Sequence, residues 1–313
     1  MLKYIIRRVL YAVPILATVS FLTILLFYGV FPPERIARNN LSAKNPTQKQ
    51  LKDWLQQHGY DKPKWTQVKD QTFALLTFNF GKSDANGEDI AEHIRKGASP
   101  SFAIALLVFV GVQLAAISGA LFLAYFRGTY VDYWGTFLCV LLMSIVSIVY
   151  IITGQFILGK VLRIFPLGGY RGGLSGLKFV MLPALIGIVA GFGNLTRLYR
   201  TFMLEEMNLD YVRTARAKGV GEQAILFKHV LKNAAIPIIT SSVATIPTLF
   251  LGSLLIESFF NIPGLGNYLV DAINSADFAV VRAMVFLGTL LTIIGYIITD
   301  IGYALVDPRV RLE

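Results

Sequence analysis

The chain has 313 residues, of which 55% are hydrophobic and only 15% are charged, and its formal net charge is +10. A soluble globular domain carries about 25% charged residues, so this composition argues against an ordinary soluble domain and indicates a membrane protein. Basic residues in short loops orient membrane proteins, so the positive charge predicts topology rather than nucleic-acid binding.

Cysteine and histidine are too sparse for a metal centre. Cys139 lies inside an apolar run, and the three histidines, His58, His93 and His229, are far apart in the chain. One cysteine cannot form an internal disulfide, so we expect Cys139 to be a small core residue and expect no metal site. No Gly-rich phosphate loop is present either, so we expect no cofactor and no ATP bound by this chain.

Six stretches of the chain contain no Asp, Glu, Lys or Arg. They cover residues 9–33, 97–126, 133–159, 179–196, 233–256 and 283–299. A membrane-spanning helix needs roughly 20 mostly apolar residues, so four stretches are long enough, and the fourth and sixth need flanking residues. The sequence therefore predicts an all-α, polytopic membrane protein with six transmembrane helices.

The basic residues predict the orientation of these helices. Lys3, Arg7 and Arg8 precede the first apolar stretch, which is too long for a signal peptide and lacks a small-residue cleavage motif. These charges place the N-terminus in the cytoplasm, and an even number of spans places the C-terminus there too. The basic loop 197–232 then also lies in the cytoplasm.

The domain boundaries follow from these spans. Residues 1–31 form the N-terminus and first helix, residues 32–96 form an external insertion, and residues 97–313 form a core of five helices. The insertion is too small for a large core, so we expect it to pack on the membrane domain or on a partner.

Two helices are expected in the insertion. The stretch from Asn45 to Gln48 is typical of a helix start with Asn45 as the cap, and Gly59 is a natural stop. Leu51, Trp54 and Leu55 would form the apolar face of this helix. A second helix is expected over residues 88–97, with Ile90 and Ile94 on one apolar face.

Residues 211–237 form a long, basic, partly amphipathic segment between two apolar stretches. This segment resembles the coupling segment of the permease subunits of ABC importers, in the dipeptide/oligopeptide/nickel family. Other stretches are similar to the same family nearly end to end: Tyr4 to Arg8, Leu51 to Trp65, Phe80 to Ser83, Ile90 to Ile94, Arg127 to Asp132, Phe165 to Gly169, Glu257 to Gly266, and Asp307 to Leu312.

The resemblance implies the ABC importer permease fold in the inner membrane, and a subunit that performs no catalysis. It also implies partners: a second homologous permease subunit, two ABC ATPase subunits that use ATP and Mg, and an external substrate-binding protein. Membrane lipid is a further partner, and nucleic acid is not.

The resemblance implies that part of the segment docks onto an ATPase subunit. The residues that match the family's coupling segment are Arg213, Thr214, Ala215, Arg216, Lys218 and Gly219. Ala215 and Gly219 lie four residues apart, so both would face one side with little bulk. Arg216 would pair with an acidic rim on the partner, and residues 225–227 would add an apolar patch. The alternative is a basic loop that only orients the protein and touches lipid headgroups.

A second group of candidates has a structural or gating role. It consists of Glu257, Pro263, Gly264, Gly266 and Asp300. Glu257 ends an uncharged stretch, so we expect it to cap the following turn or meet backbone amides there, with a transport role as the alternative. We expect Asp300 to pair with a basic residue of a neighbouring helix. Gly187 and Gly191 are expected to serve close helix packing.

The predicted function is a permease subunit of an ATP-driven importer for di- or oligopeptides. Within the family, nickel chelates, glutathione and antimicrobial peptides are alternative substrates. A stand-alone secondary transporter would need an internal repeat or charges at mid-span, and neither is evident. No span contains a Ser/His pair, paired Asp residues or a metalloprotease motif, which disfavours an intramembrane enzyme. The substrate-contacting residues cannot be identified from the sequence.

Overall fold

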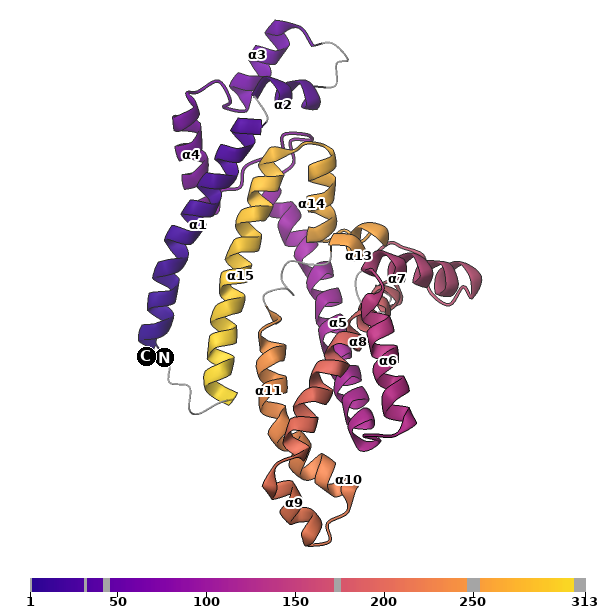
Figure 1. Ribbon diagram of the computed structural model, residues 1–313. Coiled ribbons are helices and arrows are strands. Elements are labelled where there is room, and N and C mark those ends of the chain that lie inside the picture. The colour runs from indigo at the N-terminus through magenta and orange to yellow at the C-terminus, as the bar shows by residue number, and fades with distance from the viewer. Residues whose placement is uncertain (1, 31–32, 42–45, 172–175, 247–253, 307–313) are drawn as a thin grey trace. The chain divides into compact units, whose positions relative to one another are not determined.

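The computed structural model describes residues 2–30, 33–41, 46–171, 176–246 and 254–306 (Figure 1). Over these ranges the chain is helical, and its one pairing of extended backbone is an antiparallel bridge between Lys82 and Asp89. The all-α prediction is therefore confirmed.

Four helices of the described chain are long and apolar enough to cross a membrane. They are α1 (Leu2–Val30), α5 (Ile90–Tyr125), α8 (Leu177–Met207) and α15 (Phe278–Val306). Flanking residues extend the fourth and sixth uncharged stretches into helices of 31 and 29 residues, as expected.

The third uncharged stretch is bent rather than straight. It forms α6 (Tyr130–Ser144) and α7 (Ser147–Gly154), which continues into the π-helical segment η1 (Gln155–Val161), and the two parts meet at 94°. Ile145 and Val146 adopt extended backbone between them, and β-branched residues are weak helix formers. The Leu142 carbonyl, near the end of α6, accepts from the Tyr150 hydroxyl at 2.6 Å and from Ile145 N–H at 3.3 Å.

The fifth stretch is described only in part. Its first half lies in α11 (Leu231–Val243) and its end in α13 (Leu254–Phe259), but residues 247–253 lie outside the described residues. The described chain thus has four spans, or five if the bent pair counts as one, and the number six stays a prediction.

The chain divides into two compact units, which are described separately. Unit 1 comprises residues 1–101, 250–297 and 313, and unit 2 comprises residues 102–249 and 298–312. Helices α5 and α15 each contribute to both units.

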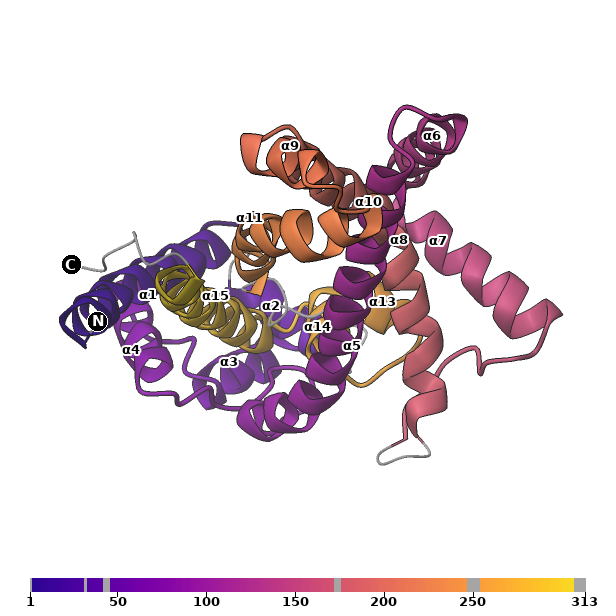
Figure 2. The ribbon, with the colours of Figure 1, turned by 90° about the horizontal axis from the view of Figure 1, so that it is seen from below.

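Unit 1 contains the predicted insertion, which is built into a common core. Its helices are α2 (Pro33–Asn40), α3 (Gln48–Gln57) and α4 (Lys64–Leu76), with α14 (Leu265–Asn274) following α13. Ile36, Trp54 and Ile90 are buried in one cluster with Leu16 of α1 and Phe286 of α15. The insertion thus packs on apolar helices, as expected. Figures 1 and 2 both show α4 alongside α1.

Helix α3 starts later than the sequence suggested. Its N-cap is Thr47, which exchanges hydrogen bonds with Gln50 in a capping box, whereas Asn45 lies outside the described residues. Two bonds close the other end: Tyr60 N–H donates to the Leu55 carbonyl at 2.8 Å, and Gly59 N–H donates to Gln56 at 3.2 Å. This is the Schellman arrangement, with Gly59 at φ +71°.

The expected second external helix is not separate. Residues from Ile90 onward belong to α5, which continues without a break to Tyr125. Ile90 is buried and Ile94 packs on the same core, so the apolar face was predicted correctly while the helix end was not.

Unit 2 is a helical layer around a second core. It holds α6, α7, α8, α9 (Asp210–Ala217), α10 (Glu222–Ala224), η3 (Ile225–Val230) and α11. Gly187 and Gly191 of α8 let α5 approach closely: a Cβ at either would lie 2.8 Å from Val108 or Val112 respectively. These glycines therefore serve packing, as expected. Cys139 is buried here as a free thiol.

Candidate functional site

The coupling candidates lie on α9 and on the turn that follows it in unit 2. Asp210 in the first turn suits the positive end of the helix, and the Thr214 hydroxyl donates to the Asp210 carbonyl at 2.9 Å. Arg213 pairs with Asp210 at 3.3 Å. These contacts are local, so α9 forms a defined short helix at the end of α8.

Gly219 ends α9 and has a structural reason to be glycine. Its φ is +78°, and its N–H donates to the Arg216 carbonyl at 2.9 Å, while Val220 N–H donates to Ala215 at 3.2 Å. This is again the Schellman arrangement, which favours glycine at the left-handed position. Gly219 is exposed, and a Cβ built on it would meet no atom within 4 Å.

One face of α9 is buried, which corrects the predicted docking face. Val212 and Ala215 pack into the core of unit 2, where Ala215 is only 8% exposed. Ala215 therefore points inward and does not share an outer face with Gly219. Their expected common small face is wrong, because the helix uses its Val212–Ala215 stripe to attach to the rest of the unit.

The exposed face of α9 and its turn is polar and basic. It consists of Arg213, Thr214, Arg216, Ala217, Lys218 and Gly219. Arg216 already holds a partner in its own chain: its guanidinium donates two hydrogen bonds to Glu222, at 2.5 and 3.1 Å. The hydrogen bond from Arg216 lowers the pKa of the Glu222 carboxyl. An acidic residue of a partner protein could therefore bind Arg216 only by sharing it with Glu222 or by displacing Glu222.

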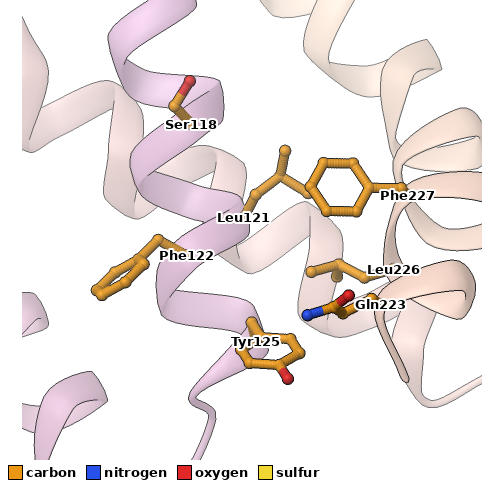
Figure 3. Close-up of a pocket in the computed structure, with 7 residues that line it drawn as sticks. All are labelled: Ser118, Leu121, Phe122, Tyr125, Gln223, Leu226 and Phe227. Atoms are coloured by element: carbon orange, nitrogen blue, oxygen red, sulfur yellow. The ribbon is translucent and has the colours of Figure 1, made fainter. Parts of the chain in front are cut away.

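The three apolar residues after α10 are divided between core and surface. Ile225 and Leu226 are buried, whereas Phe227 is 59% exposed, so the predicted patch reduces to one aromatic ring. Phe227 lines a pocket of about 360 Å³ together with residues of α5. Figure 3 shows the Phe227 ring facing Leu121, with Gln223 and Tyr125 at the other end of the pocket.

Glu257 meets backbone amides, as expected. Its carboxylate is 1% exposed and accepts from Gly266 N–H at 2.7 Å and from Asn267 N–H at 3.3 Å, at the start of α14. The Ser101 hydroxyl accepts the preceding amide, that of Leu265, at 2.8 Å. Three orphan donors of the helix start are thus satisfied, and negative charge is favoured there.

The turn between Glu257 and α14 requires its small residues. Gly264 N–H donates to the Ile262 carbonyl at 2.7 Å, so the backbone turns tightly at the exposed Pro263. A Cβ at Gly264 or Gly266 would collide with the Glu257 carboxylate. This geometry accounts for Glu257, Pro263, Gly264 and Gly266 as one structural unit, and a gating role for them stays a prediction.

Asp300 lies half-buried on α15 in unit 2. Its pairing with a basic residue stays a prediction. The C-terminal motif from Asp307 onward lies outside the described residues.

A buried ion pair in unit 2 was not foreseen. Arg200 of α8 donates to both carboxylate oxygens of Asp132, at 2.8 and 2.7 Å, and Asp132 is 4% exposed. Asp132 also accepts from Gly128 N–H at 3.1 Å. The pair joins the first turn of α6 to α8.

A second buried polar cluster links the insertion to the start of α15 in unit 1. Asp277 accepts from the Ser83 hydroxyl and from the amides of Asp84 and Val280, each amide at 3.2 Å. Asp84 in turn accepts from the Tyr60 hydroxyl at 2.9 Å and from Ala279 N–H at 3.1 Å. Both carboxylates therefore cap the start of α15. Asp277 directly precedes the helix, whereas Asp84 comes from the insertion.

We expect the stability of the protein to depend on the ionisation of Asp84. Burial raises the pKa of the Asp84 carboxyl, although Arg282 opposes the effect. A folded pKa above the unfolded one means that stability is lost as the pH rises through the folded pKa. The Asp84→Asn variant keeps an acceptor without the titration, so the wild type should lose stability relative to it as the pH rises above about 4, the ordinary pKa of an aspartate.

Denaturant unfolding of both purified proteins across this pH range measures the effect. Asp277→Asn is the matched control, because Asp277 accepts through both oxygens and an amide cannot; it should be destabilised at every pH. A pH-independent difference between wild type and Asp84→Asn would contradict the prediction.

Comparison with known proteins shows which family the sequence matches. Residues 116–312 match the family described as binding-protein-dependent transport system inner membrane component. The chain is 33% identical over 319 residues to a protein of Brucella abortus (strain 2308) named as a peptide transport system permease, with all of both chains covered.

Two further relatives cover the same length. The dipeptide transport system permease protein DppB of Lactococcus lactis subsp. cremoris (strain MG1363) is 32% identical, with 100% of each chain covered. The oligopeptide transport system permease protein AppB of Bacillus subtilis (strain 168) is 30% identical, with 99% of each chain covered.

Proposed function

Because the chain belongs to the family of binding-protein-dependent transport system inner membrane components, we propose that it is a permease subunit of an ATP-driven peptide importer. We infer the substrate class from the similarity, over the whole chain, to relatives named as peptide, dipeptide and oligopeptide permeases. A member of this family is a multi-pass membrane transport subunit and not an enzyme.

The exposed basic face of α9 is the surface proposed to dock onto an ATPase subunit. Three features support this role. The face ends at Gly219, which has open space around it, it carries Arg213, Arg216 and Lys218, and α9 is anchored in the core of unit 2 through Val212 and Ala215. A movement imposed on α9 would therefore act on this core, to which the long apolar helix α8 also contributes residues.

The proposed assembly contains a second homologous permease, two ATPase subunits and an external substrate-binding protein. Both termini and α9 lie on the ATPase side of the membrane, in line with the basic residues of segment 197–232. ATP-driven closure of the ATPases would move α9 and switch a shared cavity between inward-facing and outward-facing states. This chain contributes half of the pathway and itself binds neither ATP nor Mg.

Uptake in cells lacking this chain tests the substrate class. Labelled di- to hexapeptides and nickel are supplied in one assay, and the gene for the full chain is restored as the control. We expect peptide uptake alone to be lost. Loss of nickel uptake alone would move the chain to the metal-chelate importers of the family and would contradict the peptide assignment.

A further inference from the structure

The first turns of α1 and the second half of α15 enclose a pocket in unit 1. Its volume is about 530 Å³. The residues that line it include Arg7, Arg8, Tyr11 and Ile15 from α1, and Ile293 and Tyr296 from α15. Next to the pocket, Leu16 is buried in the core of unit 1, and Ile293 packs against that core. The inner end of the pocket therefore borders the core that holds the two helices together.

The uncharged stretches of the two helices place the pocket at one boundary of the membrane. The stretch 9–33 begins on α1 directly after Arg8, and the stretch 283–299 ends on α15. Ile15 and Ile293 each lie six residues inside their stretch, which corresponds to about 9 Å of helix. Because these two residues line one pocket, the start of the first stretch and the end of the second lie at the same level. The arginines just outside the first stretch then lie at the membrane–water boundary.

The polarity of α1 changes along the pocket. Arg7, Tyr11 and Ile15 follow one another at intervals of about one helical turn, so they lie on one face, and all three are exposed. Tyr296 of α15 is also exposed and adds a second phenolic hydroxyl. The face thus passes from a cation through hydroxyl-bearing rings to an apolar side chain. This order matches the phosphate, the glycerol esters and the acyl chain of a phospholipid.

The charge of the pocket favours an anionic headgroup. Arg7 and Arg8 are both exposed, and none of the described residues that line the pocket is acidic. A guanidinium group stays charged at physiological pH and can donate two hydrogen bonds to one phosphate. Basic pockets between membrane-spanning helices bind the headgroups of anionic lipids, whereas a zwitterionic headgroup would bring its own cation close to the arginines.

We propose that the pocket between α1 and α15 binds one anionic phospholipid, of the phosphatidylglycerol type, in the leaflet that meets the start of α1. Arg7 and Arg8 bind the phosphate, the tyrosine hydroxyls bind the glycerol ester region, and one acyl chain lies against Ile15 and Ile293. This site is separate from the proposed coupling surface, and it does not depend on which substrate the protein carries.

Lipid retention measured by native mass spectrometry tests the proposal. The full chain is purified with its co-purifying subunits in mild detergent, depleted of lipid, and titrated with phosphatidylglycerol or with phosphatidylcholine. We expect wild type to retain one phosphatidylglycerol per chain at concentrations at which phosphatidylcholine is not retained. Arg7→Gln/Arg8→Gln should raise the phosphatidylglycerol concentration for half retention by roughly tenfold or more.

Arg197→Gln/Lys232→Gln is the control that removes the same charge. Arg197 directly follows the uncharged stretch 179–196, Lys232 directly precedes the stretch 233–256, and both are exposed. Retention of phosphatidylglycerol should be unchanged in this variant. An equal loss in both double variants would mean that basic residues at the boundary attract anionic lipid without a specific site. That result would overturn the proposal, as would a wild type that retains both lipids alike or neither.

A second pair of variants tests the pocket without changing its charge. Ile15→Trp places bulk in the apolar part of the pocket and should also lower the retention of phosphatidylglycerol. Leu22→Trp, at an exposed position of α1 outside the residues that line the pocket, should leave it unchanged. Both variants keep the arginines, so they test the site even if the double arginine variant fails to insert. Unchanged retention in Ile15→Trp would mean that the lipid binds elsewhere and would overturn the assignment of the pocket.

Discussion

The Gly219→Arg variant is expected to insert and fold but to lose transport, by at least about tenfold in uptake rate. The open space around Gly219 accepts a side chain without collision inside the chain, so the loss would arise at the surface that docks onto the ATPase. The long side chain would keep that partner away from α9. Uptake in cells, membrane insertion and ATPase co-purification are measured together.

Two controls separate the docking surface from backbone strain. Gly128 has a φ of +77°, is exposed and also has no atom within 4 Å of a built Cβ, so Gly128→Arg imposes the same strain of about 1–2 kcal/mol elsewhere in unit 2. Gly219→Asn keeps a residue that tolerates the left-handed backbone. Both should transport. Normal uptake and ATPase association in Gly219→Arg would remove the coupling assignment.

The Arg200→Met variant should lose about 3–5 kcal/mol of stability. It leaves the Asp132 carboxylate, which is 4% exposed, without its bidentate partner. An isolated buried charge is costly, and the apolar replacement fills space without supplying a donor. Unfolding of the purified protein in detergent, followed by denaturant titration, measures the loss.

An exposed ion pair provides the comparison. Arg213 also pairs with an aspartate, but its side chain is 72% exposed, so Arg213→Met should cost less than about 1 kcal/mol. Adding Asp132→Asn to Arg200→Met should restore part of the loss, because the charge is removed together with its partner. If Arg200→Met and Arg213→Met lowered the free energy of unfolding equally, the buried ion pair would stabilise the protein no more than an exposed pair does.

Composition and charge spacing were enough to predict the helical membrane architecture. Uncharged stretches of sufficient length have few structural options, since backbone polar groups must be satisfied internally within a bilayer. The presence of α3 and its stop at Gly59 followed from local capping rules, although its N-cap is Thr47 and not the predicted Asn45. The Glu257 contact followed from a charge placed just before a Gly-rich turn.

Features that depend on tertiary packing could not be predicted. Nothing in the spacing of Ala215 and Gly219 reveals that the Val212–Ala215 stripe would be used to attach α9 to unit 2. The bend at Ile145 lies within an apolar stretch without proline or glycine at the break, so no local signal marks it.

The two buried polar clusters were missed for a related reason. Asp132 and Arg200 are 68 residues apart, and Asp84 and Asp277 are 193 apart, so no local pattern joins them. Each residue taken alone resembles an ordinary loop charge. Only the fold brings the partners together.

Co-purification with an ATPase subunit tests the central claim most directly. The full chain, tagged at one terminus, is isolated from membranes under mild detergent, and ATP hydrolysis of the purified material is measured alongside the Gly219→Arg variant. We predict that wild type retains an ATP-hydrolysing partner and that the variant loses it at equal expression. A chain that supports peptide uptake while purifying without any ATPase would contradict the account and favour a stand-alone secondary transporter.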